Sequence, residues 1–224
     1  MKVIITGATG MVGKGVLLEC LDHSEIEKVL IIGRNSAGIS HPKLNELLHL
    51  DFSDFTAVKG SLQGYDACYY CLGVSAAGLD EQGYRKITHD FTMALAHTLY
   101  ELNPNLTFIY VSGEGTDSSE KGRMMWARVK GRTENDILNL GFKQAFAFRP
   151  GMIIPLRGIK SRTKSYQFFY DYFMWLIKII KTLAPKSVVN TTQIGLAMIH
   201  ATLNGYEKSV VRPKDILKLS EEEV

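Results

Sequence analysis

Residues 3–13 read Val-Ile-Ile-Thr-Gly-Ala-Thr-Gly-Met-Val-Gly, and they decide the fold because they predict a strand, a glycine turn and a helix start. Gly7 permits a tight turn, Gly10 lets the backbone approach a ligand, and Gly13 lets the helix pack close to the strand. The first helical amides suit a pyrophosphate. The predicted phosphate site comprises Gly7, Thr9, Gly10, Met11, Val12 and Gly13. A glycine-rich turn without a ligand is the alternative.

Apolar runs alternate with stretches of helical periodicity downstream of this turn. The expected strands are 3–6, 28–32, 67–72, 107–111 and 144–148. The expected helices are 10–21, 81–102 and 123–140. Residues 41–48 are ambiguous and favour a short helix, followed by a short strand over 48–51. Regular alternation of this kind predicts an α/β fold, a doubly wound parallel sheet with helices on both faces.

The pattern changes after Pro155. A basic loop over 157–164 precedes an aromatic-rich helix over 165–183, a helix over 191–203 and an acidic tail over 221–223. No Pro/Ser-rich linker interrupts the chain. We therefore expect a single domain over 1–224, in which 156–224 form a small helical cap on the substrate side.

The helix over 165–183 is apolar nearly all round. Core packing over the end of the sheet is the preferred interpretation. A lid over an apolar substrate, a dimer contact, and peripheral membrane docking helped by Lys178 and Lys181 are the alternatives.

Composition favours a soluble protein: 46% of the 224 residues are hydrophobic, 22% are charged, and the formal net charge is only +3. We expect no nucleic-acid partner and no transmembrane segment, and either a monomer or a homodimer. Three cysteines and the lack of a secretory signal favour a cytoplasmic protein. The six histidines lack ligand spacing, so no metal is expected. Cys68 and Cys71 match C-x-x-C, but residues three apart in a strand face opposite sides, which argues against a redox pair.

The G-x-x-G-x-x-G spacing, together with Cys71-Leu72-Gly73, Val111-Ser112 and Arg149-Pro150-Gly151, resembles the atypical short-chain dehydrogenase/reductases. The chain is most similar to their NAD-dependent epimerase/dehydratase-like members, in the Tat-interacting-protein-like and NmrA-like branch, over residues 1–155. The resemblance implies a Rossmann fold that binds a nicotinamide dinucleotide. It also implies cofactor contacts by Cys71, Leu72, Gly73, Lys130, Pro150, Gly151 and Met152.

The end of the second expected strand bears on the choice between NADP and NAD. An acidic residue there would hold the ribose 2′-hydroxyl of NAD, but the sequence is Ile31-Ile32-Gly33-Arg34. Arg34 offers a charged, planar fork for a 2′-phosphate, so NADP(H) is predicted over NAD. A solvated loop arginine is the alternative. By resemblance, Asp51 and Phe52 fall where relatives hold the adenine edge.

The catalytic positions depart from the family pattern. Relatives carry Tyr-x-x-x-Lys, in which the lysine binds the nicotinamide ribose, the tyrosine exchanges a proton and a serine or threonine polarises the substrate oxygen. The matching lysine is Lys130, but Trp126 takes the tyrosine's place, and an indole does not exchange its proton near neutral pH. Ser112 is the candidate hydroxyl. Glu114 is a candidate replacement acid, and a solvated glutamate is its alternative.

Two interpretations of function remain. In the first, the protein is an NADP(H)-dependent oxidoreductase or an epimerase-like enzyme that acts on an unknown small molecule, with an apolar substrate as one option. In the second, it is a catalytically inactive NADP(H)-binding sensor or scaffold of NmrA-like type.

Overall fold

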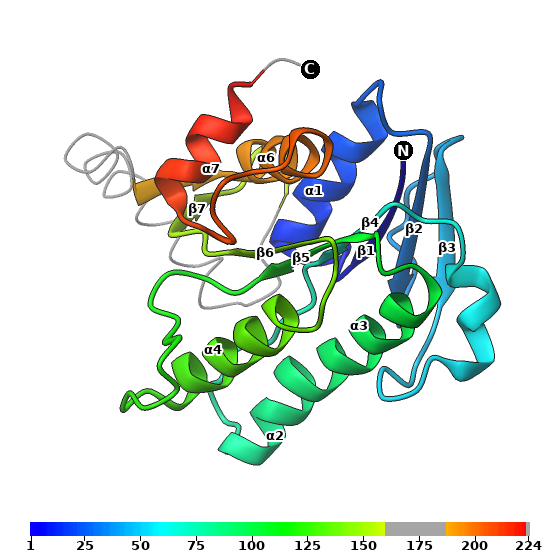
Figure 1. Cartoon of the computed structure of the whole chain (residues 1–224). Helices are drawn as coiled ribbons and strands as arrows, with labels where there is room; N and C mark the ends of the chain where they lie inside the picture. Colours follow the sequence, from blue (N-terminus) through cyan, green and yellow to red (C-terminus); the bar gives the residue numbers. More distant parts are fainter. Residues whose placement is uncertain (160–186, 223–224) are drawn as a thin grey trace.

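A seven-stranded parallel sheet, in the order β3-β2-β1-β4-β5-β6-β9, forms the centre of the protein (Figure 1). The computed structural model describes residues 1–159 and 187–222. The sheet comprises β1 (Lys2–Thr6), β2 (Lys28–Gly33), β3 (Leu44–Leu48), β4 (Ala67–Tyr70), β5 (Thr107–Val111), β6 (Gln144–Phe148) and β9 (Val210–Val211). Strands β7 (Met152–Ile154) and β8 (Val188–Asn190) form a separate parallel pair. The strand order reverses between β1 and β4, as in a doubly wound Rossmann sheet, which confirms the expected fold class.

Helices cover both faces of this sheet (Figure 1). The described helices are α1 (Met11–Asp22), α2 (Glu81–Arg85), α3 (Phe91–Leu102), α4 (Met125–Leu138), α6 (Thr191–Asn204) and α7 (Pro213–Ser220). A 3₁₀ helix spans Thr56–Leu62, and a π-helical turn over Lys86–Asp90 joins α2 to α3. Central strands such as β1 and β4 are buried along most of their length because helices lie on both sides, and this explains their unbroken apolar runs.

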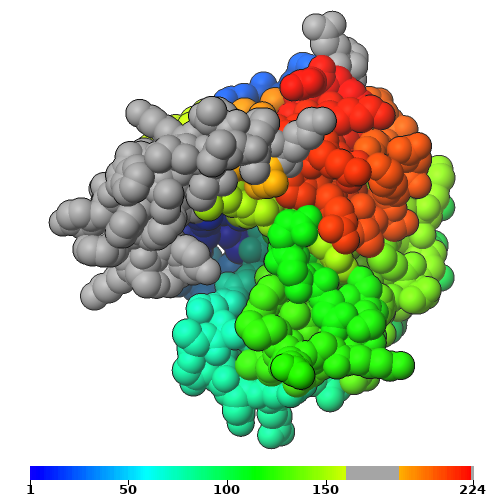
Figure 2. Space-filling view, turned by 90° about the vertical axis from the view of Figure 1, so that its left-hand side faces the viewer, coloured from blue at the N-terminus to red at the C-terminus, as the bar shows by residue number. Residues whose placement is uncertain are grey.

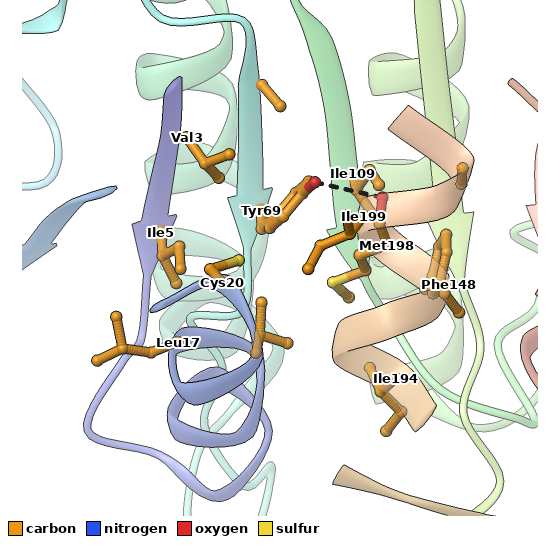
Figure 3. Packing of buried hydrophobic residues seen from close by; sticks show 14 of the residues in the cluster. Val3, Ile5, Leu17, Cys20, Tyr69, Ile109, Phe148, Ile194, Met198 and Ile199 are labelled. Carbon is orange, nitrogen blue, oxygen red and sulfur yellow. Dashed lines mark hydrogen bonds between the residues drawn. The ribbon is translucent and has the colours of Figure 1, made fainter. Parts of the chain in front are cut away.

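Two hydrophobic cores lie on opposite sides of the sheet. On one side, α1 and α6 pack together against β1 and β4, and the hydroxyl of Tyr69 donates to the carbonyl of Met198 at 3.3 Å (Figure 3). On the other side, α3 and the end of α4 cover the strand residues that point away from the first core, such as Cys68 and Tyr70 on β4. Helix α6, which was expected in the cap, therefore belongs to the layer beside α1.

The prediction for residues 41–51 was wrong. Residues 44–48 form the edge strand β3 rather than a short helix, and no strand extends over 48–51. Leucine and glutamate favour a helix locally, but the free edge of β2 supplies backbone partners, and pairing of Leu30 with Asn45 fixes the register.

The C-terminal part contains elements that the pattern did not predict, namely β7, β8, β9 and α7. Each of the three strands has only two or three residues, which is too short for a periodic signal. The predicted helix over 165–183 lies outside the described residues. In the described part of the chain, no helix is long and apolar enough to cross a membrane.

Replacing Gly13 with alanine is expected to destabilise the fold. A Cβ at this position would lie 2.3 Å from the carbonyl oxygen of Gly7, which is backbone and cannot move aside. The overpacking cost, about 2 kcal/mol, exceeds the roughly 1 kcal/mol that alanine gains over glycine in a helix. Urea unfolding should show a lower free energy for Gly13→Ala. Gly60→Ala is the control, because a Cβ at Gly60 meets nothing within 4 Å, and equal stability of the two variants would contradict the prediction.

The three cysteines are expected to resist alkylation in the folded protein. Cys68 and Cys71 lie on opposite sides of the sheet, in agreement with the interpretation that they are not a pair. Burial raises the pKa of the Cys71 thiol to about 12 and raises the pKa of Cys20 and Cys68 as well. Because the thiolate is the reactive form, mass spectrometry should show slow iodoacetamide labelling at pH 8, which becomes fast in denaturant. Rapid labelling of Cys71 in the native protein would contradict this.

Candidate functional site

A cleft with a volume of about 890 Å³ opens at the carboxyl ends of the strands, at β1 and β4, where the strand order reverses. In Figure 2 the blue N-terminal segment is visible at the bottom of a hollow, with cyan and green segments beside it. The predicted cofactor residues that line this cleft are Gly7, Thr9, Gly10, Met11, Val12, Arg34, Phe52, Cys71, Leu72, Gly73, Lys130, Pro150, Gly151 and Met152. Gly13 and Asp51 are the two that do not.

The glycine turn forms the floor of the cleft. Gly7 has φ +67°, a conformation that favours glycine. A Cβ at Gly7 would lie 2.6 Å from the carbonyl oxygen of Cys71, because the turn is in close contact with the backbone that follows β4. Gly10 is the N-cap of α1; it has no side chain to cap the helix, and the first turn holds no acidic residue. The first amides of α1 therefore remain available to an anion. Gly13 serves the packing of α1 rather than the cleft surface.

Arg34 directly follows β2, and the end of the cleft beside β2 is called its outer end. The side chain of Arg34 is exposed, and within the described ranges it makes no ion pair or hydrogen bond. Asp51 does not reach the cleft, because its carboxylate accepts hydrogen bonds from the backbone amide and hydroxyl of Ser53. These bonds lower the pKa of the Asp51 carboxyl. Of the predicted adenine-edge pair, only Phe52 is brought to the site.

Lys130, on α4, lies at the opposite end of the cleft, beside the end of β5, which is called the inner end. Its ammonium group donates to the backbone carbonyl of Ser112, at the end of β5. Burial lowers the pKa of Lys130 to about 8, against an opposing effect of the nearby Glu134 carboxylate. Arg34, Cys71 and Lys130 are the ionisable side chains among the described lining residues, and of these Lys130 alone exchanges a proton near neutral pH.

The hydroxyl of Ser112 has two partners away from the cleft. Ser112 Oγ donates to the carboxylate of Glu134 and lies 3.2 Å from the carbonyl oxygen of Phe148. The residue lines the cleft, but its hydroxyl is engaged inside the protein. The polarising role expected for Ser112 would require this hydroxyl to leave Glu134.

Trp126 and Glu114 do not line the cleft. The indole packs on Gly115, where a Cβ would come within 3.0 Å of the ring. The Glu114 carboxylate lies 3.6 Å from the guanidinium of Arg212. Trp126 lies one helical turn before Lys130 on α4, but neither its indole nor the Glu114 carboxylate contributes to the described lining of the cleft.

Sequence reasoning missed part of the cleft lining, including Val74, Ser75, Ile87, Phe91 and Ile153. Ile87 and Phe91 are four residues apart in the predicted helix 81–102, a spacing that could have placed them on one face. Ile153 belongs to β7, which gave no periodic signal. No group of three His, Cys, Asp or Glu side chains with metal-binding geometry occurs within the described ranges.

Comparisons of sequence identify relatives of the chain. Residues 3–120, more than half of the chain, match the profile of the NAD dependent epimerase/dehydratase family. Protein HTATIP2 of Rattus norvegicus is 28% identical over 155 residues, which are 68% of this chain and 63% of the rat protein. The chain thus spans less than two thirds of that relative. Protein FMP52 of Saccharomyces cerevisiae is 26% identical over 231 residues, 98% of this chain and 96% of the yeast protein.

Solved structures show the same fold. The UDP-N-acetylglucosamine 4-epimerase of Methanobrevibacter ruminantium superposes with a TM-score of 0.71 and 17% identity, covering 94% of this chain and 75% of the epimerase. WbmF of Bordetella bronchiseptica, solved in complex with NAD+, gives a TM-score of 0.69 and 14% identity, covering 98% of this chain and 76% of WbmF. At these identities the likeness concerns the fold alone.

One expectation is corrected by these relatives. The FMP52 proteins of Saccharomyces cerevisiae and Chaetomium globosum are named mitochondrial, which contradicts the expectation of a cytoplasmic protein. Free thiols are compatible with any reducing compartment, so they do not distinguish the cytosol from the others. The resemblance stated from the motifs is confirmed: the chain belongs to the NAD dependent epimerase/dehydratase family and has the NAD(P)-binding fold of short-chain dehydrogenase/reductase-like proteins.

Proposed function

We propose that the cleft binds NADP(H) and that the protein is an oxidoreductase or an epimerase-like enzyme. The observation that carries the proposal is the uncapped N-terminus of α1, which faces the cleft behind the Gly7 turn. A pyrophosphate there would accept hydrogen bonds from backbone amides and would meet the positive end of the helix dipole. The cleft volume of about 890 Å³ lies in the range of cofactor sites.

The charges along the cleft favour a dinucleotide with an additional phosphate. Arg34 at the outer end and Lys130 at the inner end are its cationic residues, and the described lining contains no carboxylate. An unpaired guanidinium is free to bind a 2′-phosphate bidentately, whereas the 2′-hydroxyl of NAD offers no charge for it to pair with. This supports NADP(H) over NAD.

The cleft suits an apolar substrate, because Val74, Ile87, Val111 and Ile153 are among the residues that line it. When bound, the nicotinamide supplies a hydride donor or acceptor. Lys130 would hold the nicotinamide ribose, and as the proton-exchanging group of the described lining it would deliver or accept the proton at the substrate oxygen.

A cofactor sensor without catalysis is the second candidate. It is supported by the positions of the other predicted catalytic side chains, since the Ser112 hydroxyl is bonded to Glu134 and the Glu114 carboxylate lies beside Arg212. A sensor needs the dinucleotide site but no proton donor.

Titration calorimetry with NADPH and NADH tests the cofactor assignment. We expect NADPH to bind more tightly, and Arg34→Ala to weaken NADPH binding by at least about tenfold while NADH binding changes little, because the substitution removes charge-assisted bonds to the 2′-phosphate. Arg132→Ala is the control, since Arg132 is an exposed arginine paired with Asp136 outside the cleft. Failure of both dinucleotides to bind, or equal losses for both in Arg34→Ala, would overturn the assignment.

Oxidation of NADPH in the presence of apolar aldehydes and ketones separates the two candidates. We expect turnover that Lys130→Met abolishes and that Trp126→Phe retains, because the indole lies outside the cleft. Tight NADPH binding without turnover on any carbonyl compound would favour the sensor. Loss of activity in Trp126→Phe with unchanged stability would show that the indole participates after all.

A further inference from the structure

Glu134 is a buried carboxylate one helical turn after Lys130 on α4, with 1% of its side chain exposed. It accepts hydrogen bonds from the hydroxyl of Ser112 and from the guanidinium of Arg149, whose Nε lies 2.9 Å from Oε1 and 3.2 Å from Oε2. The guanidinium also donates through Nη2 to Glu134 and to the hydroxyl of Ser118. The carboxylate thus joins α4, the end of β5 and the residue after β6, and Arg149 extends the network to Ser118 in the loop after β5.

Each element that Glu134 joins also carries a part of the cleft. Lys130 lies on α4, Ser112 follows β5 and offers its carbonyl to Lys130, and Arg149 precedes the lining residues Pro150 and Gly151. The polar network therefore lies directly behind the inner end of the cleft, opposite the side on which a ligand would bind.

Stability alone does not account for such a pair. Removing two charges from water costs several kcal/mol, and a well-packed apolar pair of the same volume often stabilises a fold equally well or better. Apolar side chains, however, would not fix the hydroxyl of Ser112 or align the ends of two strands, because packing has no directional preference of that kind.

We propose that Glu134 is a positioning residue for the cofactor: its bonds to Ser112 and Arg149 hold the Ser112 carbonyl, Lys130 and the Pro150-Gly151 wall in the arrangement that receives the nicotinamide end of NADP(H). This inference rests on the proposed function. Ser112, Glu134 and Arg149 would preorganise the inner end of the cleft without contacting the cofactor through their own side chains. Lys130 would make the side-chain contact.

The charges around Lys130 give this role a measurable signature. Burial lowers the pKa of Lys130, and the negative charge of Glu134 on α4 opposes this with a smaller upward effect. The other charged or titratable groups face the Glu134–Arg149 pair rather than Lys130 itself: Tyr110 on β5 lies near Glu134, and Glu114 and Asp117 in the loop after β5 lie near Arg149. Loss of the Glu134 charge removes the stabilisation of the ammonium form, so the pKa of Lys130 falls further.

The experiment measures NADPH affinity between about pH 6 and pH 10 together with thermal stability. The variants are Glu134→Gln, Ser112→Ala and the double replacement Glu134→Leu/Arg149→Met. Lys130→Arg removes the titration while keeping a cation. Asp215→Asn is the matched control, because Asp215 is a second buried carboxylate with a lysine partner, at 2.8 Å from Lys208, and it does not line the cleft.

We expect wild-type affinity to fall as pH rises through about 8, where Lys130 loses its proton. In Glu134→Gln the fall should occur at lower pH, with roughly tenfold weaker binding at neutral pH. Ser112→Ala should weaken binding less, and Lys130→Arg should show no fall. The double variant should regain stability but not affinity, and Asp215→Asn should lose stability alone.

Three results would overturn the inference: unchanged NADPH affinity in Glu134→Gln, an unchanged pH midpoint in that variant, or recovery of affinity together with stability in the double variant. In each of these cases, NADPH binding by the wild-type protein would leave the proposed function intact. A wild-type protein that binds no NADPH overturns the proposed function first, and the inference with it.

Discussion

The close contact between the Gly7 turn and the end of β4 is the constraint on which the rest of the structure depends. The space between them holds no Cβ, since one at Gly7 would lie 2.6 Å from the Cys71 carbonyl oxygen, and one at Gly13 would lie 2.3 Å from the Gly7 carbonyl oxygen. These two approaches set the position of α1 on the sheet. They also place its N-terminus where the strand order reverses, so that the cleft and the helix dipole coincide.

The opposite wall of the cleft is built differently, from side chains rather than bare backbone. The ends of β5 and β6 are joined through Ser112, Glu134 and Arg149, all buried. Such a network costs desolvation, and it is stable only while every member is bonded. Consequently the Ser112 hydroxyl is committed to the interior, and the lysine one turn earlier receives a fixed carbonyl partner.

Sequence patterns predicted the parts of this protein in which local and long-range preferences agree. The glycine turn, the central strands and α1 have the expected bounds to within a residue or two, because an unbroken apolar run is buried between two helical layers. The pattern failed for β3, where the edge of β2 overrides the helix propensity of Leu44–Leu48, and for β7 to β9, which are too short for periodicity. For the site, the glycine spacing and the family resemblance together identified about half of the described cleft lining, but they could not show that Asp51 bonds to Ser53. They also could not show that Glu114 lies beside Arg212.

The contrast between the two walls explains why the family pattern is intact at one end of the cleft and altered at the other. Recognition of a pyrophosphate by backbone amides depends on glycine and on the helix start, and it tolerates changes in most neighbouring side chains. Proton transfer depends on one side chain of suitable pKa aimed at one atom. Exchange of tyrosine for Trp126 removes such a group, and the indole instead packs on Gly115. A chain that keeps the amides, the two cations and the Glu134 network but lacks this acid retains the parts that the proposed dinucleotide site requires. Lys130 is then the group on which any proton transfer in the described part of the cleft would depend.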